Sequence, residues 1–412
     1  MNISDFPAIS ETASLDELDS RRTRFLDLLS ERFPDWETVL LVNRVNHLYF
    51  AGTMQDAVLV FQKDGSRKLF VRRSFERACD ESPLPREEIL PMRSFRDVVS
   101  VIGAHSGVTC VEKDVLTISL LEMMERNFQM TRILGVDPII ARVRAVKSPW
   151  EMAWMEESGK RHHRFLTETL PTLLWEGMTE LELVGDVYRG ALLAGYQGIS
   201  RFAMFQTEVA YGQYGFGDSS LYPTSFNGPA GSFGMSAAIP FVGSRTRRLE
   251  AGMSVFADIG FGMNGYHTDK TQVYFFCGNR PDAQIPSEAL DAHAQCIEIQ
   301  REIVRRLVPG AIPDQIYADV MASLSEEFKR NFQGFGSRQA KFLGHGIGLQ
   351  VDEYPVIARG FTEPLQENVV LAVEPKKGIA GFGTVGVEDS FVVTSEGGRC
   401  LTGGPREIIE CG

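Results

Sequence analysis

The stretch 253–276, MSVFADIGFGMNGYHTDKTQVYFF, joins two apolar runs through a glycine-rich segment. Apolar runs of this length separated by turn residues are typical of a β-hairpin, whose loop we place at GFGMNG, residues 260–265. In that register residue 259 pairs with residue 266, and the side-chain period of two decides which residues share a face, unless a bulge shifts it. The acidic and basic residues expected on one face are Asp258, His267 and Asp269.

Carboxylates inside apolar strands recur further along the chain. Glu374 lies within VVLAVEPKKG and Glu388 within GTVGVEDSFVVT. A carboxylate on an apolar face is costly to bury unless a positive group joins it. A salt bridge from Lys270 or Arg280 would serve in the hairpin, although Lys270 is expected on the opposite face. A metal ion satisfies several such carboxylates better.

A single histidine stands between glycines in KFLGHGIGLQVDEYPVI, residues 341–357, with Asp352 and Glu353 following it. Alone, this segment could be a turn with a buried imidazole. Together with the strand carboxylates, His345 completes an oxygen-rich donor set that suits divalent ions such as Mn²⁺, Co²⁺, Fe²⁺ or Zn²⁺. Two ions about 3.5–4 Å apart would share a hydroxide and stabilise a tetrahedral intermediate. The predicted metal ligands are Asp258, Asp269, His345, Glu374 and Glu388.

Composition limits the class of protein. The chain has 412 residues, of which 43% are apolar and 23% charged, as in soluble globular proteins of about two domains. It contains no long apolar run and no basic-then-apolar leader, so we expect a cytoplasmic protein with no membrane association. The formal net charge of −12 disfavours nucleic acid as a partner. Six scattered cysteines without a CxxC pair argue against a zinc ribbon or a disulfide framework.

The sequence pattern divides the chain into two predicted domains. An amphipathic helix over 16–33 and strand-like runs at TVLLVN, HLYFAG, AVLVFQ and RKLFVRR indicate a small α/β domain over 1–145. Ser148, Pro149 and Glu151 form a capping-box signal that begins a long helix and a second domain over 146–412. In that domain we expect helices near 286–308 and 313–331 and strands near 252–259, 266–277, 368–375 and 384–394.

Residues 211–234, YGQYGFGDSSLYPTSFNGPAGSFG, are too rich in glycine for a regular element. Long ordered loops are usually functional, so a functional loop or a lid is one interpretation. A disordered insertion is the alternative, although the aromatic residues favour a packed loop.

The segments ADIG, GYHTDKT, GHGIGL, VEP and VED, in this order, resemble the M24 or pita-bread metallopeptidases, which include prolidase, Xaa-Pro aminopeptidase and methionine aminopeptidase. Residues 1–145 are similar to the creatinase/prolidase N-terminal domain, with VNHLYFAGT and RAVKSPWEM as its recognisable ends. The resemblance implies an α+β protein with a C-terminal pita-bread domain, and a homodimer. It also implies that Asp258 binds one metal, that His345 and Glu374 bind the other, and that Asp269 and Glu388 bridge both.

The chain departs from the family at three positions. Proline-specific members carry catalytic histidines where this chain has Phe241 and Asp352, and an arginine where it has Gly386. Asp352 could exchange a proton near the metals or be a surface acid. His267 could reach the site or be a packed imidazole. The family also implies that Glu374 assists proton transfer.

The leading hypothesis is a dinuclear metal-dependent hydrolase of peptide-like amide bonds, of the Xaa-Pro aminopeptidase or dipeptidase type. Two divalent ions, with Mn²⁺ favoured, would supply a bridging hydroxide as nucleophile, and the partners would be small peptides or small molecules. One alternative is a diverged M24-fold metalloenzyme acting on a non-peptide metabolite, as creatinase and a dimethylsulfoniopropionate lyase do. Another is a non-catalytic binding module, as in chromatin-associated relatives, which usually lose metal ligands.

Overall fold

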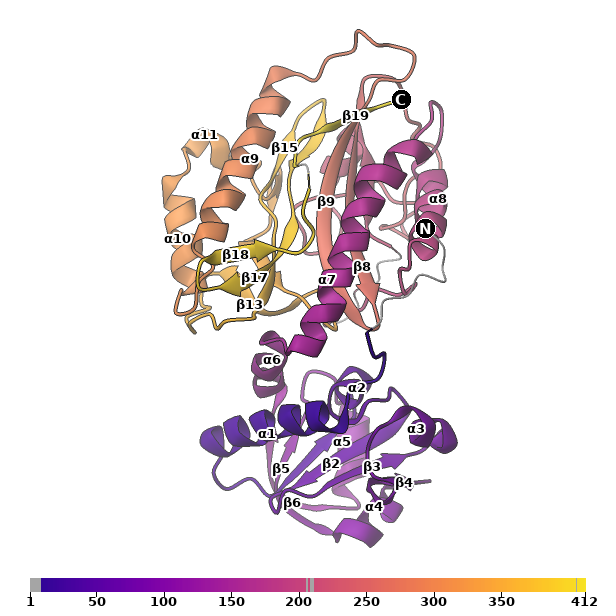
Figure 1. Cartoon of the computed structure of the whole chain (residues 1–412), viewed down its shortest axis with the longest axis vertical. Helices are drawn as coiled ribbons and strands as arrows, with labels where there is room; N and C mark the ends of the chain where they lie inside the picture. Colours follow the sequence, from indigo (N-terminus) through magenta and orange to yellow (C-terminus); the bar gives the residue numbers. More distant parts are fainter. Residues whose placement is uncertain (1–8, 205–206, 208–210, 405) are drawn as a thin grey trace. The chain divides into compact units, whose positions relative to one another are not determined.

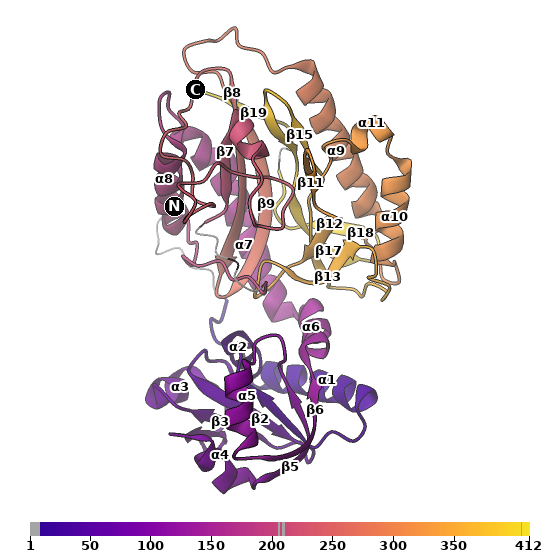
Figure 2. The same cartoon turned by 180° about the vertical axis from the view of Figure 1, so that it is seen from behind.

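A computed structural model describes residues 9–204, 207, 211–404 and 406–412. The chain divides into two compact units, Ser10–Arg144 and Ala145–Gly412 (Figures 1 and 2). Within the described residues, no helix combines the length and the apolarity that crossing a bilayer requires.

The first unit is a mixed sheet covered by helices on both faces. The strand order is β4-β3-β2-β1-β5-β6. Alternate residues of the strands face opposite sides, so Phe61 packs on Phe25 of α1, while Leu40 and Val60 contribute to the cluster that contains Phe95 of α4. The strands are β1 Thr38–Leu41, β2 Ala57–Gln62, β3 Arg67–Val71, β4 Ile89–Pro91, β5 His105–Val111 and β6 Gln129–Gly135. The α-helices are α1 Leu15–Arg32, α2 Arg44–Ala51, α3 Phe75–Glu81, α4 Phe95–Ile102, α5 Ile118–Glu125 and α6 Asp137–Ala145.

One predicted strand of this unit is wrong. HLYFAG lies in α2, because Asn43 caps the helix by accepting a hydrogen bond from the Val45 N–H and Gly52 ends it in the left-handed conformation at φ 73°. The aromatic residues of this strand-like run, Tyr49 and Phe50, are buried in the core as part of the helix.

The second unit contains a four-stranded sheet, β19-β9-β8-β7, and a five-stranded sheet, β13-β12-β14-β17-β18, with two short two-stranded sheets, β15-β16 and β10-β11. The strands are β7 Gln213–Phe216, β8 Met253–Met263, β9 Tyr266–Phe276, β10 Gly334–Phe335, β11 Arg338–Gln339, β12 Phe342–Gly346, β13 Glu353–Ala358, β14 Val370–Val373, β15 Lys376–Ile379, β16 Gly383–Gly386, β17 Asp389–Thr394, β18 Gly397–Cys400 and β19 Ile409–Cys411. The α-helices are α7 Pro149–Arg164, α8 Glu180–Leu193, α9 Ser287–Arg305, α10 Pro313–Ser323 and α11 Glu326–Lys329.

The helix α7 begins where the sequence predicts, with the capping box of Ser148 and Glu151 formed, and it contacts the β8–β9 hairpin (Figures 1 and 2). The predicted helix 313–331 is instead broken between α10 and α11, where the Ser325 side chain caps a new helix. The predicted strand 384–394 is likewise divided, into β16 and β17, and Glu388 lies in the break.

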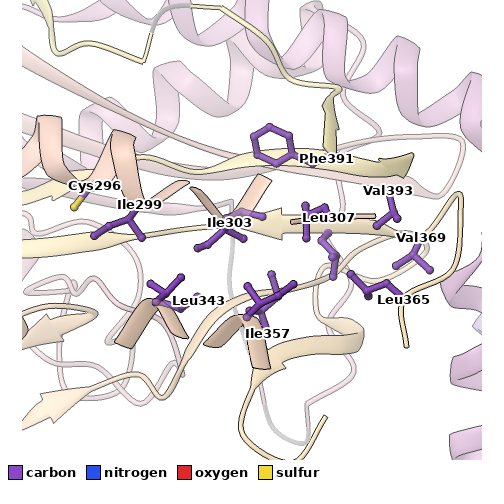
Figure 3. Packing of buried hydrophobic residues seen from close by; sticks show 14 of the residues in the cluster. Cys296, Ile299, Ile303, Leu307, Leu343, Ile357, Leu365, Val369, Phe391 and Val393 are labelled. Carbon is purple, nitrogen blue, oxygen red and sulfur yellow. The ribbon is translucent and has the colours of Figure 1, made fainter. Parts of the chain in front are cut away.

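The five-stranded sheet is covered by α9 and α10 on one face. Figure 3 shows Ile303 and Leu307 of α9 near Phe391 and Val393 of β17, within one buried cluster. Odd-numbered residues of β14 and β17 therefore face the helices. Even-numbered positions face the other side, where strands β14 and β17 contact β9. Glu374 and Glu388 are even-numbered, so their side chains point toward the hairpin.

The β8–β9 hairpin is longer and tighter than predicted. Its turn is the dipeptide Asn264-Gly265, with φ values of 48° and 90°, a backbone conformation that Asn-Gly adopts at little cost. Asp258 consequently pairs with Thr271 rather than standing opposite His267. The predicted register is wrong by an even number of positions, so Asp258 and Asp269 still share a face.

Candidate metal centre

The hairpin brings the first two carboxylates together. Asp269 is paired with Gly260, two residues along β8 from Asp258. Glu388 is held against the same face because the Thr271 hydroxyl donates to Glu388 Oε2 at 2.9 Å and the Thr271 N–H donates to the Glu388 carbonyl at 3.2 Å. The bridge between Thr271 and Glu388 thus joins the two sheets at the site.

The glycines around His345 allow two strands to approach closely. His345 pairs with Ala372 of β14, and a Cβ at Gly344 would lie 2.3 Å from the Ala372 carbonyl oxygen. The adjacent Glu374 N–H donates to the Leu343 carbonyl at 3.0 Å, which places Glu374 beside His345. The glycines therefore have a structural purpose, which is to let β12 lie flat against β14.

All five predicted metal ligands line one cavity of about 40 Å³, together with Asp352. They form two overlapping groups in which one donor atom from each residue lies within 4.8 Å of the others. Asp269, His345 and Glu388 form the first group, which we call the histidine triad. Asp258, Glu374 and Glu388 form the second, which we call the lysine triad because all three contact Lys376.

His345 is oriented for coordination through Nε2. Its Nδ1 lies 3.0 Å from the Gly346 carbonyl oxygen, an acceptor that requires a proton on Nδ1. Its Nε2 lies 3.5 Å from Glu374 Oε1 and 3.8 Å from Glu388 Oε1. Although burial opposes it, the surrounding carboxylates, Asp352 foremost, raise the pKa of His345. The donor chemistry at Nε2 fits a divalent cation.

A lysine lies among the carboxylates of the second group. Lys376 Nζ donates to Asp258 Oδ2 at 2.8 Å, to Glu374 Oε2 at 2.8 Å and to Glu388 Oε2 at 2.7 Å. Its side chain is fully buried. Burial alone would lower the pKa of Lys376, but the three carboxylates raise it well above its usual value. The lysine triad therefore already contacts a cation.

Burial dominates the electrostatics of the carboxylates. It raises the pKa of Asp269 and of Glu388 well above their ordinary values, and each effect is increased by neighbouring acids. Burial also raises the pKa of Glu374, although Lys376 and His345 oppose the shift. Such a crowded set of acids is expected to bind cations, because a cation stabilises all the ionised forms together.

Of the other two predicted catalytic residues, Asp352 lines the cavity and His267 does not. Asp352 lines the cavity, and its Oδ1 lies 3.5 Å from His345 Nδ1. His267 is buried away from the cavity lining, with Nδ1 3.0 Å from the Gly348 carbonyl oxygen and Nε2 3.0 Å from the Gln197 amide nitrogen. This arrangement supports a packed imidazole at His267. Lys270 points to the opposite face, as predicted, and pairs with Asp389 at 2.6 Å.

Two site residues were missed by the sequence reasoning, Lys376 and Gln213. The signal for Lys376 was present, because it lies two residues after Glu374 and so shares its side in an extended chain. Gln213 lies in β7, within the segment that seemed too glycine-rich for a strand, and it pairs with Asp258. The prediction of an irregular segment is wrong for β7, because Gly212 and Gly215 permit close contact with Asp258 and Ser220.

Comparison with known proteins gives independent matches over both units. Residues 153–395 match the profile of metallopeptidase family M24, and residues 21–146 match the creatinase/prolidase N-terminal domain. An Xaa-Pro dipeptidase of Pyrococcus furiosus is 23% identical over 90% of this chain and 95% of its own length.

Solved structures share the fold over nearly the whole chain. An X-Pro aminopeptidase of Thermotoga maritima matches with a TM-score of 0.72 and 21% identity, covering 94% of this chain and 99% of its own. The N-terminal domain of the FACT complex subunit SPT16 from chickpea matches with a TM-score of 0.66 and 12% identity, covering 97% of this chain and 100% of its own. These matches confirm the predicted architecture, a creatinase-type N-terminal domain followed by a pita-bread domain.

Proposed function

Because the chain belongs to metallopeptidase family M24, we propose that it is a metal-dependent hydrolase of peptide-like amide bonds, of the Xaa-Pro dipeptidase or aminopeptidase type. The observation that carries this proposal is the convergence of five ligating side chains, from segments far apart in sequence, on one cavity. Relatives named as dipeptidases, including a putative dipeptidase of Bacillus subtilis that is 25% identical over 73% of this chain and 72% of its own length, support small peptides as substrates.

Different residues would bind the metal ions, transfer the proton and orient His345 during hydrolysis. Asp269, His345 and Glu388, with Asp258 and Glu374 beside them, would hold the divalent ions that the family implies. When bound, such ions activate water and stabilise negative charge on the attacked carbonyl oxygen. Glu374 Oε1, which lies on the His345 side, would take the proton of the water and return it to the departing amine. Asp352 would hold His345 in its orientation through Nδ1.

Three finer features are predictions: a dinuclear centre with Mn²⁺, inferred from the set of donor residues, a homodimer, implied by the resemblance, and a cytoplasmic location, expected from the composition. A second candidate function is hydrolysis or lysis of a small non-peptide molecule. It is favoured by the aromatic side chains of Phe202, Phe226 and Phe342 in the small cavity and by Phe241 and Asp352 at the positions of the usual histidines. The retained ligand set argues against a purely non-catalytic module.

The test is a substrate screen with a matched inactive variant. Purified protein loaded with Mn²⁺ or Co²⁺ is assayed against dipeptides, Xaa-Pro peptides and a panel of small metabolites. We expect peptide cleavage that chelators abolish. Asp269→Asn should lower it by about a thousandfold, because several kcal/mol of charge stabilisation are lost. Turnover of a metabolite but of no peptide would favour the second candidate and reject the first.

A further inference from the structure

The ammonium of Lys376 uses its hydrogen-bonding capacity fully within the lysine triad. An ammonium carries three N–H donors. Its three contacts are to one oxygen each of Asp258, Glu374 and Glu388, at 2.7 to 2.8 Å. These are the same three residues that form the second potential metal group. The ammonium thus does for this group what a metal ion would do.

The two glutamates divide their oxygens between the triads. Glu374 and Glu388 each turn Oε2 to Lys376 Nζ and leave Oε1 on the side of His345 Nε2. Glu388 Oε2 also accepts the Thr271 hydroxyl hydrogen bond, which fixes the orientation of that carboxylate. One half of the site is therefore arranged around an ammonium, and the other half contains the imidazole nitrogen of His345 and carboxylate oxygens.

The backbone holds Lys376 in this position. Its N–H donates to Gln333 Oε1 at 2.8 Å, and its carbonyl accepts from the Gln333 N–H at 2.8 Å. Across β16 it is paired with Gly386, where a Cβ would lie 2.6 Å from the Lys376 Cα. The side chain cannot leave the triad by a simple movement of an exposed loop, because its strand is paired on both sides.

We propose that the ammonium of Lys376 takes the place of one of the two ions, so that the site binds a single divalent cation in the histidine triad. Four carboxylates around one ammonium leave the site strongly negative, and one divalent ion balances most of that charge. A second ion would have to compete with the ammonium for the oxygens of Asp258, Glu374 and Glu388 that Lys376 already contacts. This inference rests on the proposed function for the kind of ion bound, but it concerns the number of ions.

The experiment counts ions. The purified protein is stripped with chelator, reloaded with Mn²⁺, and analysed for metal per chain by elemental analysis and calorimetry. We expect one equivalent in the wild type and two in Lys376→Met, with the uncoupled Mn²⁺ paramagnetic signal of the wild type replaced by that of a coupled pair. Lys377→Met is the matched control, because Lys377 Nζ donates to the Phe328 carbonyl at 2.9 Å and to that of Arg330, outside the site. It should keep one equivalent.

Two equivalents, or none, in the wild type would overturn the proposal even if Lys376→Met does not fold. An unchanged single equivalent in a folded Lys376→Met protein would also contradict it. The outcome is independent of substrate. One bound ion with no peptide cleavage would contradict the proposed function and support this inference. Peptide cleavage with two bound ions would support the proposed function and contradict this inference.

A second observation concerns Gln213. Its side chain is 3% exposed and lines the cavity beside Asp258, yet neither its amide nitrogen nor its amide oxygen has a hydrogen-bond partner among the described residues. A buried polar group without a partner costs about 1–3 kcal/mol. A buried polar group without a protein partner therefore calls for an explanation, such as an ion, a water molecule or a role in the site.

The geometry points to Gln213 as the residue that recognises a peptide group of the substrate. A primary amide offers one donor side and one acceptor side, which complement the C=O and N–H of a peptide bond. A simple carboxylate could use only the donor side. This inference deepens the proposed function, since it favours peptides over non-peptide acids in the same cavity.

The test measures binding to metal-stripped protein by calorimetry, so that no turnover is needed. Gln213→Leu should weaken dipeptide binding about tenfold or more, because hydrogen bonds worth about 1–3 kcal/mol are lost, and should leave binding of a single amino acid unchanged. Gln272→Leu is the control, because its amide nitrogen donates to the carbonyls of Val273 and Glu407. It should lower stability and leave the affinity intact. Equal affinities of wild type and Gln213→Leu for the dipeptide would refute the assignment, whether or not the loaded enzyme cleaves peptides.

Discussion

Two buried lysines of the second unit, Lys270 in β9 and Lys376 in β15, differ in the balance of charge around them. Lys270 Nζ contacts Asp389 Oδ1 at 2.6 Å, and Arg406 Nε contacts Asp389 Oδ2 at 2.9 Å. That cluster has more cations than acids and also includes a hydrogen bond from the Thr402 hydroxyl. Lys376 instead contacts three carboxylates.

The two clusters are built from adjacent residues. Asp269 and Glu388 point into the site, whereas Lys270 and Asp389, the next residues on the same two segments, meet on the other face. Because side chains alternate between the two faces, the cluster with an excess of cations lies on one face and the cluster with an excess of carboxylates lies on the other. The difference teaches that a buried lysine–carboxylate contact is by itself no sign of function. The excess of acids around Lys376 is what indicates a ligand.

The largest expected effect distinguishes the two lysines by their response to metal. Lys270→Met should lower the free energy of unfolding by about 3 kcal/mol, because a buried carboxylate loses a partner. Mn²⁺ should stabilise this variant only as much as it stabilises the wild type, because the histidine triad is unchanged. Lys376→Met should also be destabilised in chelator. Mn²⁺ at about a hundred times its Kd should stabilise this variant by about 2.7 kcal/mol more than it stabilises the wild type. The reason is that a second ion binds in the lysine triad of the variant.

The measurement is urea unfolding with chelator and with Mn²⁺. A larger stabilisation of Lys270→Met than of the wild type by Mn²⁺, or an identical metal response of Lys376→Met and the wild type, would remove the distinction between the two clusters.

A smaller effect is expected at the glycine opposite Lys376. Gly386 has φ 125°, and an added Cβ would lie 2.4 Å from the Pro375 carbonyl oxygen and 2.6 Å from the Lys376 Cα. Gly386→Ala should therefore cost about 2–3 kcal/mol of stability and displace the ammonium. Gly381→Ala is the control, because Gly381 also has a positive φ, of 76°, but no atom lies within 4 Å of the position that its Cβ would take. It should cost about 1 kcal/mol. Equal losses in thermal unfolding would show that crowding against Lys376 is unimportant.

The positions that the sequence predicted well are those where alternation along a strand decides the outcome. Asp258 and Asp269 were placed on one face although the hairpin register was wrong, because an even error in register preserves the face. Glu374 and Glu388 stood out as acids among buried valines. The shared metal site was inferred from the unusual acids and His345 themselves, whereas the architecture and the role of each ligand followed from the family resemblance.

The features that escaped prediction depend on tertiary contacts or on a local signal that was overlooked. The Asn264-Gly265 turn was such a signal, and it alone would have corrected the register. The contact of Lys376 with Asp258 joins residues 118 positions apart, so sequence could suggest only its side relative to Glu374. Gln213 could not be recognised as unpartnered, because an absence of partners is a property of the packed molecule.

The smallest expected effect concerns the charge on the Lys270 side of the hairpin. His162 of α7 is fully buried and stacks on Phe261, and burial together with the nearby positive Lys270 lowers its pKa well below 6.5. The folded protein therefore keeps His162 neutral while the unfolded chain takes up a proton below pH 6.5, so this contribution to stability is present above that pH and is lost as the pH falls. His162→Phe should retain the packing and reduce the pH slope of the unfolding free energy by about 1.4 kcal/mol per pH unit below this value, relative to the wild type.

Urea unfolding followed by tryptophan fluorescence across this range measures the difference, and comparison with the wild type removes the contributions of the other buried histidines. Identical slopes would mean that His162 is protonated in the folded protein, and the positive character assigned to this side of the hairpin would then be wrong.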